Sequence, residues 1–281
     1  MDGILLINKR ETWTSRDVVN RLTKRFNTKK IGHTGTLDPF ATGLLIVTVG
    51  KATKAGQFLE AMDKEYIATL KLGKSTDTLD LTGTVVEEKE VSLPLDENKV
   101  KDVLKEFLGE IEQVPPKYSA ININGMKAYE RTRLGEEVVI PSRKVNIFDL
   151  ELLNIKDDEI TFKVHCSKGT YVRTLGEDIA KKLGYPGHLI MLKRTRVGEF
   201  ALENSKDVNE VNEEDFISVS EALSNYKHYV CNEKTEQDVR NGIKLKLNEN
   251  EDLLMVSKSN EALAIYSKGE DGLYHTVRGL F

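Results

Sequence analysis

The chain has 281 residues, of which 39% are hydrophobic and 31% are charged, a balance typical of a water-soluble globular protein with one or two domains. No apolar run approaches the ~20 residues that span a bilayer, and the start "MDGILLINKR" is too soon charged for a secretory signal. Two cysteines without ligand spacing argue against a disulfide framework and a zinc site, and favour a reducing cytosol.

The formal net charge of −4 conceals an uneven distribution. Residues 1–56 contain ten Lys or Arg against four Asp or Glu, a net charge of +6, whereas residues 201–226 contain one Lys against seven acids, a net charge of −6. A basic face that binds nucleic acid can therefore coexist with an acidic total. Ordinary fluctuation of charge along a chain explains the pattern equally well.

The first 50 residues predict two strands and one helix. The apolar runs 4–7 and 44–50 are typical of buried strands. Residues 14–26 predict a helix with Thr14 or Ser15 as its N-cap. The apolar stripe of this helix would comprise Val18, Val19, Leu22 and Phe26, and its polar side Arg16, Arg21, Lys24 and Arg25.

The next segments predict two strands and a second helix. Residues 65–73 alternate polar and apolar positions and predict a half-buried strand, and residues 82–91 predict another. Residues 96–111 predict an amphipathic helix with Gly109 at its end. Its inward face would carry Val100, Val103, Leu104, Phe107 and Leu108.

Residues 113–142 interrupt this pattern with two prolines and a polar loop, and predict a projecting arm with a short helix closed by Gly135. Residues 144–155 and 159–166 predict two strands, and residues 169–184 predict a helix that ends at a glycine. The inner face of that helix would carry Val172, Leu175, Ile179 and Leu183.

The predicted secondary structure changes after an acidic stretch at residues 203–215. From about residue 228 the chain shows short strands and turns, at 241–247, 252–258, 262–268 and 273–281. This pattern predicts a small β-barrel appended to a mixed α/β domain.

Several common catalytic motifs do not occur. The sequence contains no G-x-x-x-x-G-K-[ST] phosphate loop, no H-E-x-x-H pair and no G-x-S-x-G elbow, and its five histidines are scattered. A metal site or a Ser–His triad therefore has no support, which leaves carboxylate chemistry without a cofactor.

Asp38 is the best single candidate for that chemistry. It lies in the segment GHTGTLDPFATGLLIV, between a turn of glycines and threonines and an apolar run, and Pro39 biases it away from helix. Such a carboxylate either caps the turn or acts as a nucleophile. A nucleophile has to stay ionised, and since burial opposes ionisation, a cationic partner would help.

The residues around Asp38 closely resemble the signature of the bacterial tRNA pseudouridine synthases that modify uridine 55 in the T-loop, the TruB family: KKIGHTGTLDPFATGLLIVTVGKATK. The resemblance continues in the same order over most of residues 1–200, in the blocks DKEYIATLKLG, TDTLDLTGTV, QVPPKYSAININGMKAYERTRLG, SKGTYVRTLGEDIAKKLG and GHLIMLKRTRVGEF. It implies an α/β (α+β) catalytic domain, residues 1–226, with a central mixed, largely antiparallel sheet flanked by helices. A thumb at about 113–142 would close on RNA. Residues 227–281 are weakly similar to the small PUA-like RNA-binding barrel of these enzymes.

The resemblance also implies an activity. Such an isomerase flips uridine 55 out of the T-loop of tRNA, breaks the bond between uracil N1 and ribose C1′, and rejoins the base through C5. It needs no cofactor and no metal, binds the T-arm stem–loop of tRNA and works in the cytoplasm, away from membranes. We expect a monomer, because no long exposed apolar stripe is evident. Whether the carboxylate adds to the sugar or removes the C2′ proton stays open.

The resemblance assigns catalytic roles to Asp38, Tyr66 and Arg173. Tyr66 would stack on the target base and can take part in a proton transfer, and the guanidinium of Arg173 would hold Asp38 ionised. His33 would fill the gap left by the flipped base, which offsets part of an unstacking cost of a few kcal/mol. The other substrate-binding residues are Tyr171, Leu192 and Lys9. On pattern alone, a core position is the better explanation for Tyr66 and Leu192, a turn position for His33, and a surface position for Arg173.

One segment departs from the family. The sequence INKRETWTS has Arg10 and Thr12 where the family's K-P-x-G-x-T-S has proline and glycine, which can alter the entry to the first helix or an RNA contact. Two alternatives stay open at this point. A module that clamps and refolds tRNA without chemistry would share the basic helix, the thumb and the barrel, but would not need Asp38. A small-molecule enzyme with a phosphate on GHTGT would need a helix N-terminus after that loop, which the sequence lacks.

Overall fold

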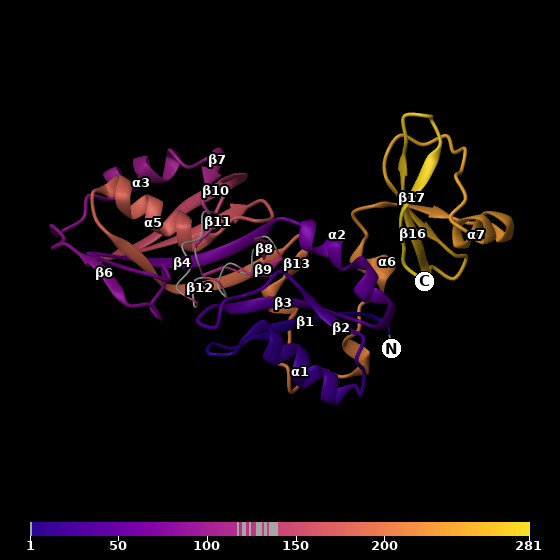
Figure 1. Ribbon diagram of the computed structural model, residues 1–281, viewed down its shortest axis with the longest axis horizontal. Coiled ribbons are helices and arrows are strands. Elements are labelled where there is room, and N and C mark those ends of the chain that lie inside the picture. Colours follow the sequence, from indigo (N-terminus) through magenta and orange to yellow (C-terminus); the bar gives the residue numbers. More distant parts are fainter. Residues whose placement is uncertain are drawn as a thin grey trace.

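The computed structural model of the chain describes residues 2–116, 118–119, 122–123, 125–127, 131, 134 and 140–281. In this part of the chain, a nine-stranded sheet has the core order β1-β3-β12-β4-β11-β10-β7, with β2 paired to β3 and β13 paired to β12 (Figure 1). Only the β12–β3 pair of this sheet is parallel. The predicted mixed, largely antiparallel sheet is therefore confirmed. Its strands are β1 (Gly3–Lys9), β2 (Ile31–Thr34), β3 (Thr42–Val49), β4 (Lys64–Leu72), β7 (Gly109–Gln113), β10 (Arg143–Lys156), β11 (Glu159–Cys166), β12 (Gly187–Val197) and β13 (Phe200–Ala201).

The apolar run in β1 is continuous because both faces of this strand are buried. Leu5 and Ile7 belong to the main core, which fills the space between the sheet and the helices α1 (Ser15–Arg25), α3 (Glu97–Lys105) and α5 (Val172–Leu183). Ile4 and Leu6 point to the other face, where a second core includes residues of η1 (Gly50–Ala55), α2 (Gly56–Ala61) and α6 (Val219–Ala222). Alternation of side chains along a strand thus supplies two cores from one run.

The helix ends follow the capping rules. Of the two N-caps predicted for α1, Thr14 or Ser15, the structure has Thr14, which forms a capping box with Asp17. Helix α5 ends at Gly184, which has φ 91°. The predicted inward residues of α5 are buried, namely Val172, Leu175, Ile179 and Leu183.

The predicted helix over residues 96–111 was too long. Helix α3 ends at Lys105, and Gly109, with φ 89°, instead starts β7, which pairs with β10. Leu108 does not face the core but is 44% exposed. Cross-strand hydrogen bonding decides the state of residues 109–113, and a helical periodicity cannot show it.

Two further predictions need correction. The strand expected at 82–91 is only β6 (Val85–Glu88), an exposed strand that pairs with β5 (Lys74–Thr76). In the C-terminal part, residues 241–247 form no strand beyond a bridge at Leu245, and helix α7 (Glu233–Arg240) lies where only strands and turns were expected. The side chain of Asn232 caps this helix, a signal that the sequence carried.

The C-terminal residues form a separate four-stranded sheet, seen apart from the main sheet in Figure 1. Apolar side chains of this sheet, among them Leu254 and Val256, join the second core beneath β1 and α2. The domain boundary at 226/227, the closed barrel and the PUA-like assignment stay predictions. The strands are β14 (Lys227–Val230), β15 (Leu253–Val256), β16 (Ala262–Lys268) and β17 (Tyr274–Gly279).

The remaining short elements are the strands β8 (Asn122–Ile123) and β9 (Met126–Lys127) and the 3-10 turns η2 (Leu202–Asn204) and η3 (Glu213–Asp215). The short helix expected before Gly135 lies largely outside the described residues, as does about half of the predicted thumb. Across the described ranges, no helix combines the length and the apolar character needed to cross a membrane.

Candidate active site

A cleft of about 1140 Å³ brings most of the predicted site residues together. Its walls come from the start of α1, the loop after β2, strands β4 and β12, and the segment that leads into α5. All of the predicted site residues except Lys9 line it, namely His33, Asp38, Tyr66, Tyr171, Arg173 and Leu192.

The loop that carries Asp38 is tied to the start of α1. The hydroxyl of Ser15 accepts a hydrogen bond from the Leu37 backbone N–H at 2.9 Å and donates to the Leu37 carbonyl at 3.2 Å. On the other side of Asp38, the Pro39 carbonyl accepts hydrogen bonds from the Thr12 N–H at 2.8 Å and the Lys9 ammonium at 3.3 Å. Residues 37–39 are therefore held on both sides of the carboxylate.

Lys9 lies beneath this loop, outside the set of residues that line the cleft. It is 1% exposed, and its ammonium also donates to the carbonyls of Arg10 at 3.0 Å and Trp13 at 2.5 Å. Burial lowers the pKa of Lys9 to about 8, partly offset by the nearby Asp38 carboxylate. The geometry supports a role in positioning the Pro39 carbonyl, while the predicted substrate contact stays a prediction.

Arg194 of β12 links the two ends of the loop that carries Asp38. Its guanidinium donates to the Leu44 carbonyl at 2.7 Å and to the Gly35 carbonyl at 3.0 Å. The backbone of Arg194 also packs directly on Gly43, where an added Cβ would lie 2.3 Å from the Arg194 carbonyl oxygen. With φ 101°, Gly43 is a position that only glycine can fill.

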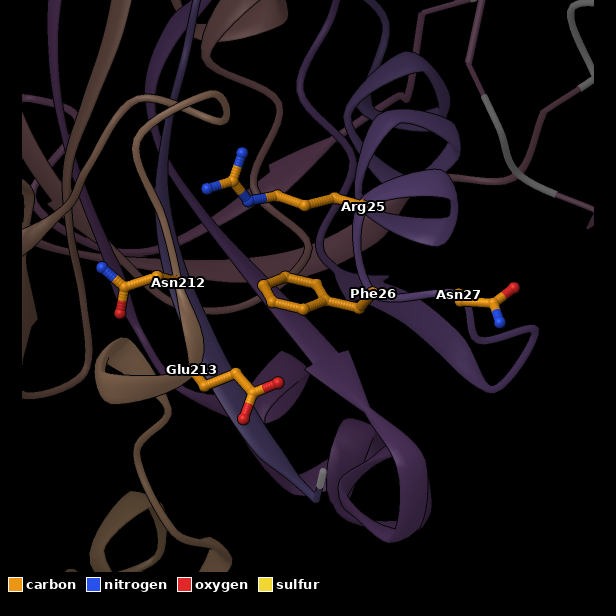
Figure 2. Close-up of a pocket in the computed structure, with 5 residues that line it drawn as sticks. All are labelled: Arg25, Phe26, Asn27, Asn212 and Glu213. Carbon is orange, nitrogen blue, oxygen red and sulfur yellow. The ribbon is translucent and has the colours of Figure 1, made fainter.

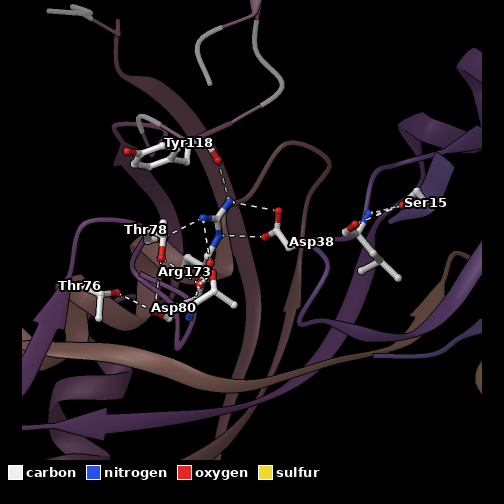
Figure 3. A network of polar contacts seen from close by, with 9 residues as sticks. Ser15, Asp38, Thr76, Thr78, Asp80, Tyr118 and Arg173 are labelled. Carbon is white, nitrogen blue, oxygen red and sulfur yellow. Dashed lines mark hydrogen bonds and ion pairs between the residues drawn. The ribbon is translucent and has the colours of Figure 1, made fainter. Parts of the chain in front are cut away.

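Arg173 is the centre of the polar network shown in Figure 3. Its Nε lies 2.9 Å from Asp38 Oδ2 and its Nη2 lies 3.2 Å from Asp38 Oδ1, a bidentate pair. Nη2 also donates to the Tyr118 carbonyl at 3.1 Å, and Nη1 donates to the Thr78 carbonyl at 2.7 Å and to Asp80 at 3.2 Å. These contacts engage the five N–H groups of the guanidinium, so its orientation is set from every side.

The sequence reasoning missed Asp80. This carboxylate is 3% exposed and accepts hydrogen bonds from the Thr82 N–H at 2.9 Å, the Thr82 hydroxyl at 2.5 Å and the Thr78 hydroxyl at 2.9 Å, in addition to Arg173. Its position in TDTLDLTG, an aspartate among hydroxyl side chains at short spacing, was the available signal. Asp80 holds Arg173 from the side opposite to Asp38.

Two opposing influences act on the Asp38 carboxyl. Desolvation raises its pKa above the ordinary value, the Arg173 guanidinium opposes this, and the Asp80 carboxylate adds to the increase. The side chain is nevertheless 33% exposed, toward the cleft. The ion pair therefore keeps an anion in a partly desolvated position from which a substrate can be reached.

Three predicted substrate-binding residues, Tyr66, Leu192 and His33, line the cleft. Tyr66 on β4 is 8% exposed and Leu192 on β12 is 6% exposed. Burial raises the pKa of Tyr66, so its phenol stays neutral, and burial together with Arg194 lowers the pKa of His33, so its imidazole stays neutral. An aromatic face, an apolar side chain and a neutral imidazole suit a stacked, uncharged base.

Tyr171 is fixed by a side chain that the sequence reasoning also missed. Gln113, 1% exposed at the end of β7, accepts a hydrogen bond from the Tyr171 N–H at 3.0 Å and donates to the Tyr171 carbonyl at 3.2 Å. Since Tyr171 is the N-cap of α5, this amide anchors the turn from which Arg173 projects.

A second, smaller pocket of about 450 Å³ lies at the end of α1 (Figure 2). Its lining combines Arg25, Phe26, Asn27, Asn212 and Glu213, without any residue of the polar network. In the described ranges, no group of three or more His, Cys, Asp or Glu side chains is arranged to hold a metal ion.

Comparisons with known proteins identify the family of the chain. The model of the "TruB family pseudouridylate synthase (N terminal domain)" matches residues 23–172, and that of the "tRNA pseudouridylate synthase B C-terminal domain" matches residues 173–230. This chain belongs to the TruB family of pseudouridine synthases. It is thus an isomerase that acts on RNA, which confirms the resemblance seen in the sequence.

Curated TruB relatives match over almost the whole chain. The chain is 41% identical to a tRNA pseudouridine synthase B of Bacillus cytotoxicus, over 95% of this chain and 92% of the relative. It is 43% identical to a tRNA pseudouridine synthase B of Clostridium tetani, over 95% of this chain and 93% of the relative. A chain in "Structure of H/ACA RNP bound to a substrate RNA containing 2'-deoxyuridine" shares the fold, with a TM-score of 0.73 and 21% identity over 99% of this chain and 85% of that chain.

Proposed function

We propose that this TruB-family enzyme converts uridine 55 in the T-loop of tRNA to pseudouridine, with Asp38 as the catalytic carboxylate. The Asp38–Arg173 ion pair in a large cleft that Tyr66 also lines is the observation that carries the assignment. The names of the relatives, tRNA pseudouridine synthase B, support tRNA as the substrate. The T-arm stem–loop would be the part of the tRNA that enters the cleft.

The proposed reaction is an isomerisation in which one bond to the sugar replaces another. The flipped uridine stacks on Tyr66 and Leu192, and His33 fills the gap it leaves in the RNA. The N1–C1′ bond breaks, the uracil turns, C5 bonds to C1′, the C5 proton is lost, and N1 takes up a proton, so that the product is an isomer of uridine. Asp38, held as an anion by Arg173, either adds to C1′ or takes the C2′ proton, and either step uses a carboxylate without any cofactor.

A binding module without chemistry is a poorer fit to the cleft. A clamp for tRNA does not need a buried carboxylate whose guanidinium partner is held by a second carboxylate, Asp80. Placing two acids and one arginine in a desolvated site is costly, and such sites are characteristic of catalysis. We further propose a cytoplasmic monomer, and residues 227–281 as a PUA-like RNA-binding domain.

Release of tritium from a T-arm stem–loop labelled at C5 of its uridines tests the function. Wild-type protein should release one equivalent and leave pseudouridine at position 55. Asp38→Asn should release none, yet bind the same RNA within about a few-fold of wild type, because phosphate and base contacts elsewhere carry affinity. Asp149→Asn, an exposed aspartate on β10, is the matched control and should react as wild type does. Turnover by Asp38→Asn would contradict the assignment, and lack of release by wild type would defeat the enzyme on this substrate.

A further inference from the structure

Arg143, the first residue of β10, is packed against one wall of the cleft. Its guanidinium carbon lies 4.5 Å from the centroid of the Tyr171 ring, within the range of a cation–π contact. The guanidinium also donates to the Gly169 carbonyl. Gly169 has φ 86°, and a Cβ added there would lie 3.4 Å from the guanidinium carbon. A ring and a bare backbone turn therefore hold this guanidinium.

The guanidinium lacks an anionic partner in the part of the chain that the structure describes. Its neighbour Lys144, in contrast, pairs with Glu110 at 2.7 Å. The Nε of Arg143 is buried and has no acceptor among the described residues. Leaving a buried N–H of a charged group without an acceptor is unfavourable, so the described residues do not fully satisfy this guanidinium.

The surroundings indicate an anionic ligand. Lys144 and Lys168 line the same wall as Arg143, together with the Ser167 and Thr170 side chains. The carboxylates of Asp38 and Asp80, which also line the cleft, are already engaged by Arg173. Lys144 is already paired with Glu110, and the Thr170 hydroxyl donates to the Ser167 carbonyl. The fixed guanidinium of Arg143, with Lys168 and the Ser167 hydroxyl on the same cleft lining, matches a phosphate, whose oxygens accept from planar N–H pairs.

We propose that Arg143 binds a backbone phosphate of the RNA next to the flipped uridine, with Tyr171 and Gly169 holding its guanidinium in place. This role rests on the proposed function, since an RNA strand has to enter the cleft. Tyr171 stacks on Arg143 and leads directly into Arg173, which holds Asp38. A phosphate on Arg143 would therefore set the register of the nucleotide that faces the catalytic carboxylate.

A double-mutant cycle between one arginine and one phosphate tests this contact. The probes are T-arm stem–loops that carry a single neutral methylphosphonate linkage at each position around uridine 55. Arg143→Gln should weaken binding of the unmodified RNA by roughly 10- to 100-fold and reduce the magnitude of the salt slope of log K by about 1. One particular neutral linkage should weaken wild-type binding by a similar factor, and should cause no further loss with Arg143→Gln.

Two other variants separate binding from folding. Arg196→Gln, at a 35% exposed arginine on β12 outside the cleft lining, is the matched control and should bind every RNA as wild type does. Gly169→Ala keeps the charge but strains the turn whose carbonyl holds the guanidinium, because residue 169 has φ 86°, and it should weaken binding and reduce the coupling to the same linkage. Thermal unfolding of each variant, together with a comparison of kcat and KM, shows whether the change is confined to RNA binding.

Wild-type affinity of Arg143→Gln would overturn the phosphate contact. So would equal losses in wild type and Arg143→Gln at every neutral linkage, because additive effects mean that the two groups do not meet. Tritium release by wild type on the unmodified RNA is measured in parallel. If Arg143 and the neutral linkage remain coupled but no tritium is released, the proposed isomerase activity on this RNA is overturned while the phosphate contact stands.

Discussion

The substitution Arg173→Lys perturbs the network at its centre while conserving its charge. The guanidinium reaches two carboxylates and two backbone carbonyls through three nitrogen atoms. A lysine ammonium has three N–H groups on a single nitrogen and cannot span from Asp38 to Asp80. At 4% exposure, little water is available to replace the lost contacts.

The expected loss follows from these contacts. Removing one partner of a buried ion pair costs about 3–5 kcal/mol of free energy. Because lysine keeps the positive charge, the loss for Arg173→Lys should lie near the lower end of this range. If Asp38 makes this contact in the transition state, about 3 kcal/mol corresponds to a rate roughly 100-fold lower, because each 1.36 kcal/mol is a factor of ten. A decrease in thermal stability should accompany the change.

Single-turnover tritium release at saturating enzyme measures the chemical step apart from RNA binding. Arg196→Lys, at a partly exposed site on β12 outside the cleft lining, controls for the loss of a guanidinium and should react at the wild-type rate. A rate for Arg173→Lys within about threefold of wild type would show that the bidentate pair is dispensable, and the reasoning from the network would fail.

Further predictions concern the same network and its loop. Asp80→Asn should lower the unfolding free energy by about 3 kcal/mol in chemical denaturation, because a buried guanidinium loses a charged partner, and an unchanged value would contradict this. Gly43→Ala should cost about 3 kcal/mol or more, since backbone strain and a clash with Arg194 add. Gly109→Ala, with positive φ but no neighbour within 4 Å, should cost only about 1 kcal/mol. Finally, kcat should fall as the pH falls through the raised pKa of Asp38, so the acid midpoint in a pH–rate profile should lie above 3.8. A midpoint at or below 3.8 would be inconsistent with a desolvated carboxyl.

Much of the fold was predictable because its signals are local. The continuous run in β3, the alternation in β4 and the glycine that ends α5 each depend on residues close in sequence. The wrong predictions, at residues 96–111 and 82–91, share a non-local cause. Strand β7 exists because it pairs with β10, 30 or more residues further on, and in the part of the chain that the structure describes β6 pairs with β5, a strand of three residues. Hydrogen bonding between distant segments overrides local periodicity.

For the site, the sequence by itself determined the candidate chemistry: an aspartate before proline in a glycine-rich loop, and a family motif that names Tyr66 and Arg173. Only the tertiary structure decided how the carboxylate is held. It placed Asp80 behind Arg173, Gln113 against Tyr171 and Lys9 beneath the loop rather than in the cleft. The reason is physical. The pKa and the orientation of a buried ionisable group depend on every dipole and charge within a few ångströms, and those neighbours come from strands and helices far apart along the chain.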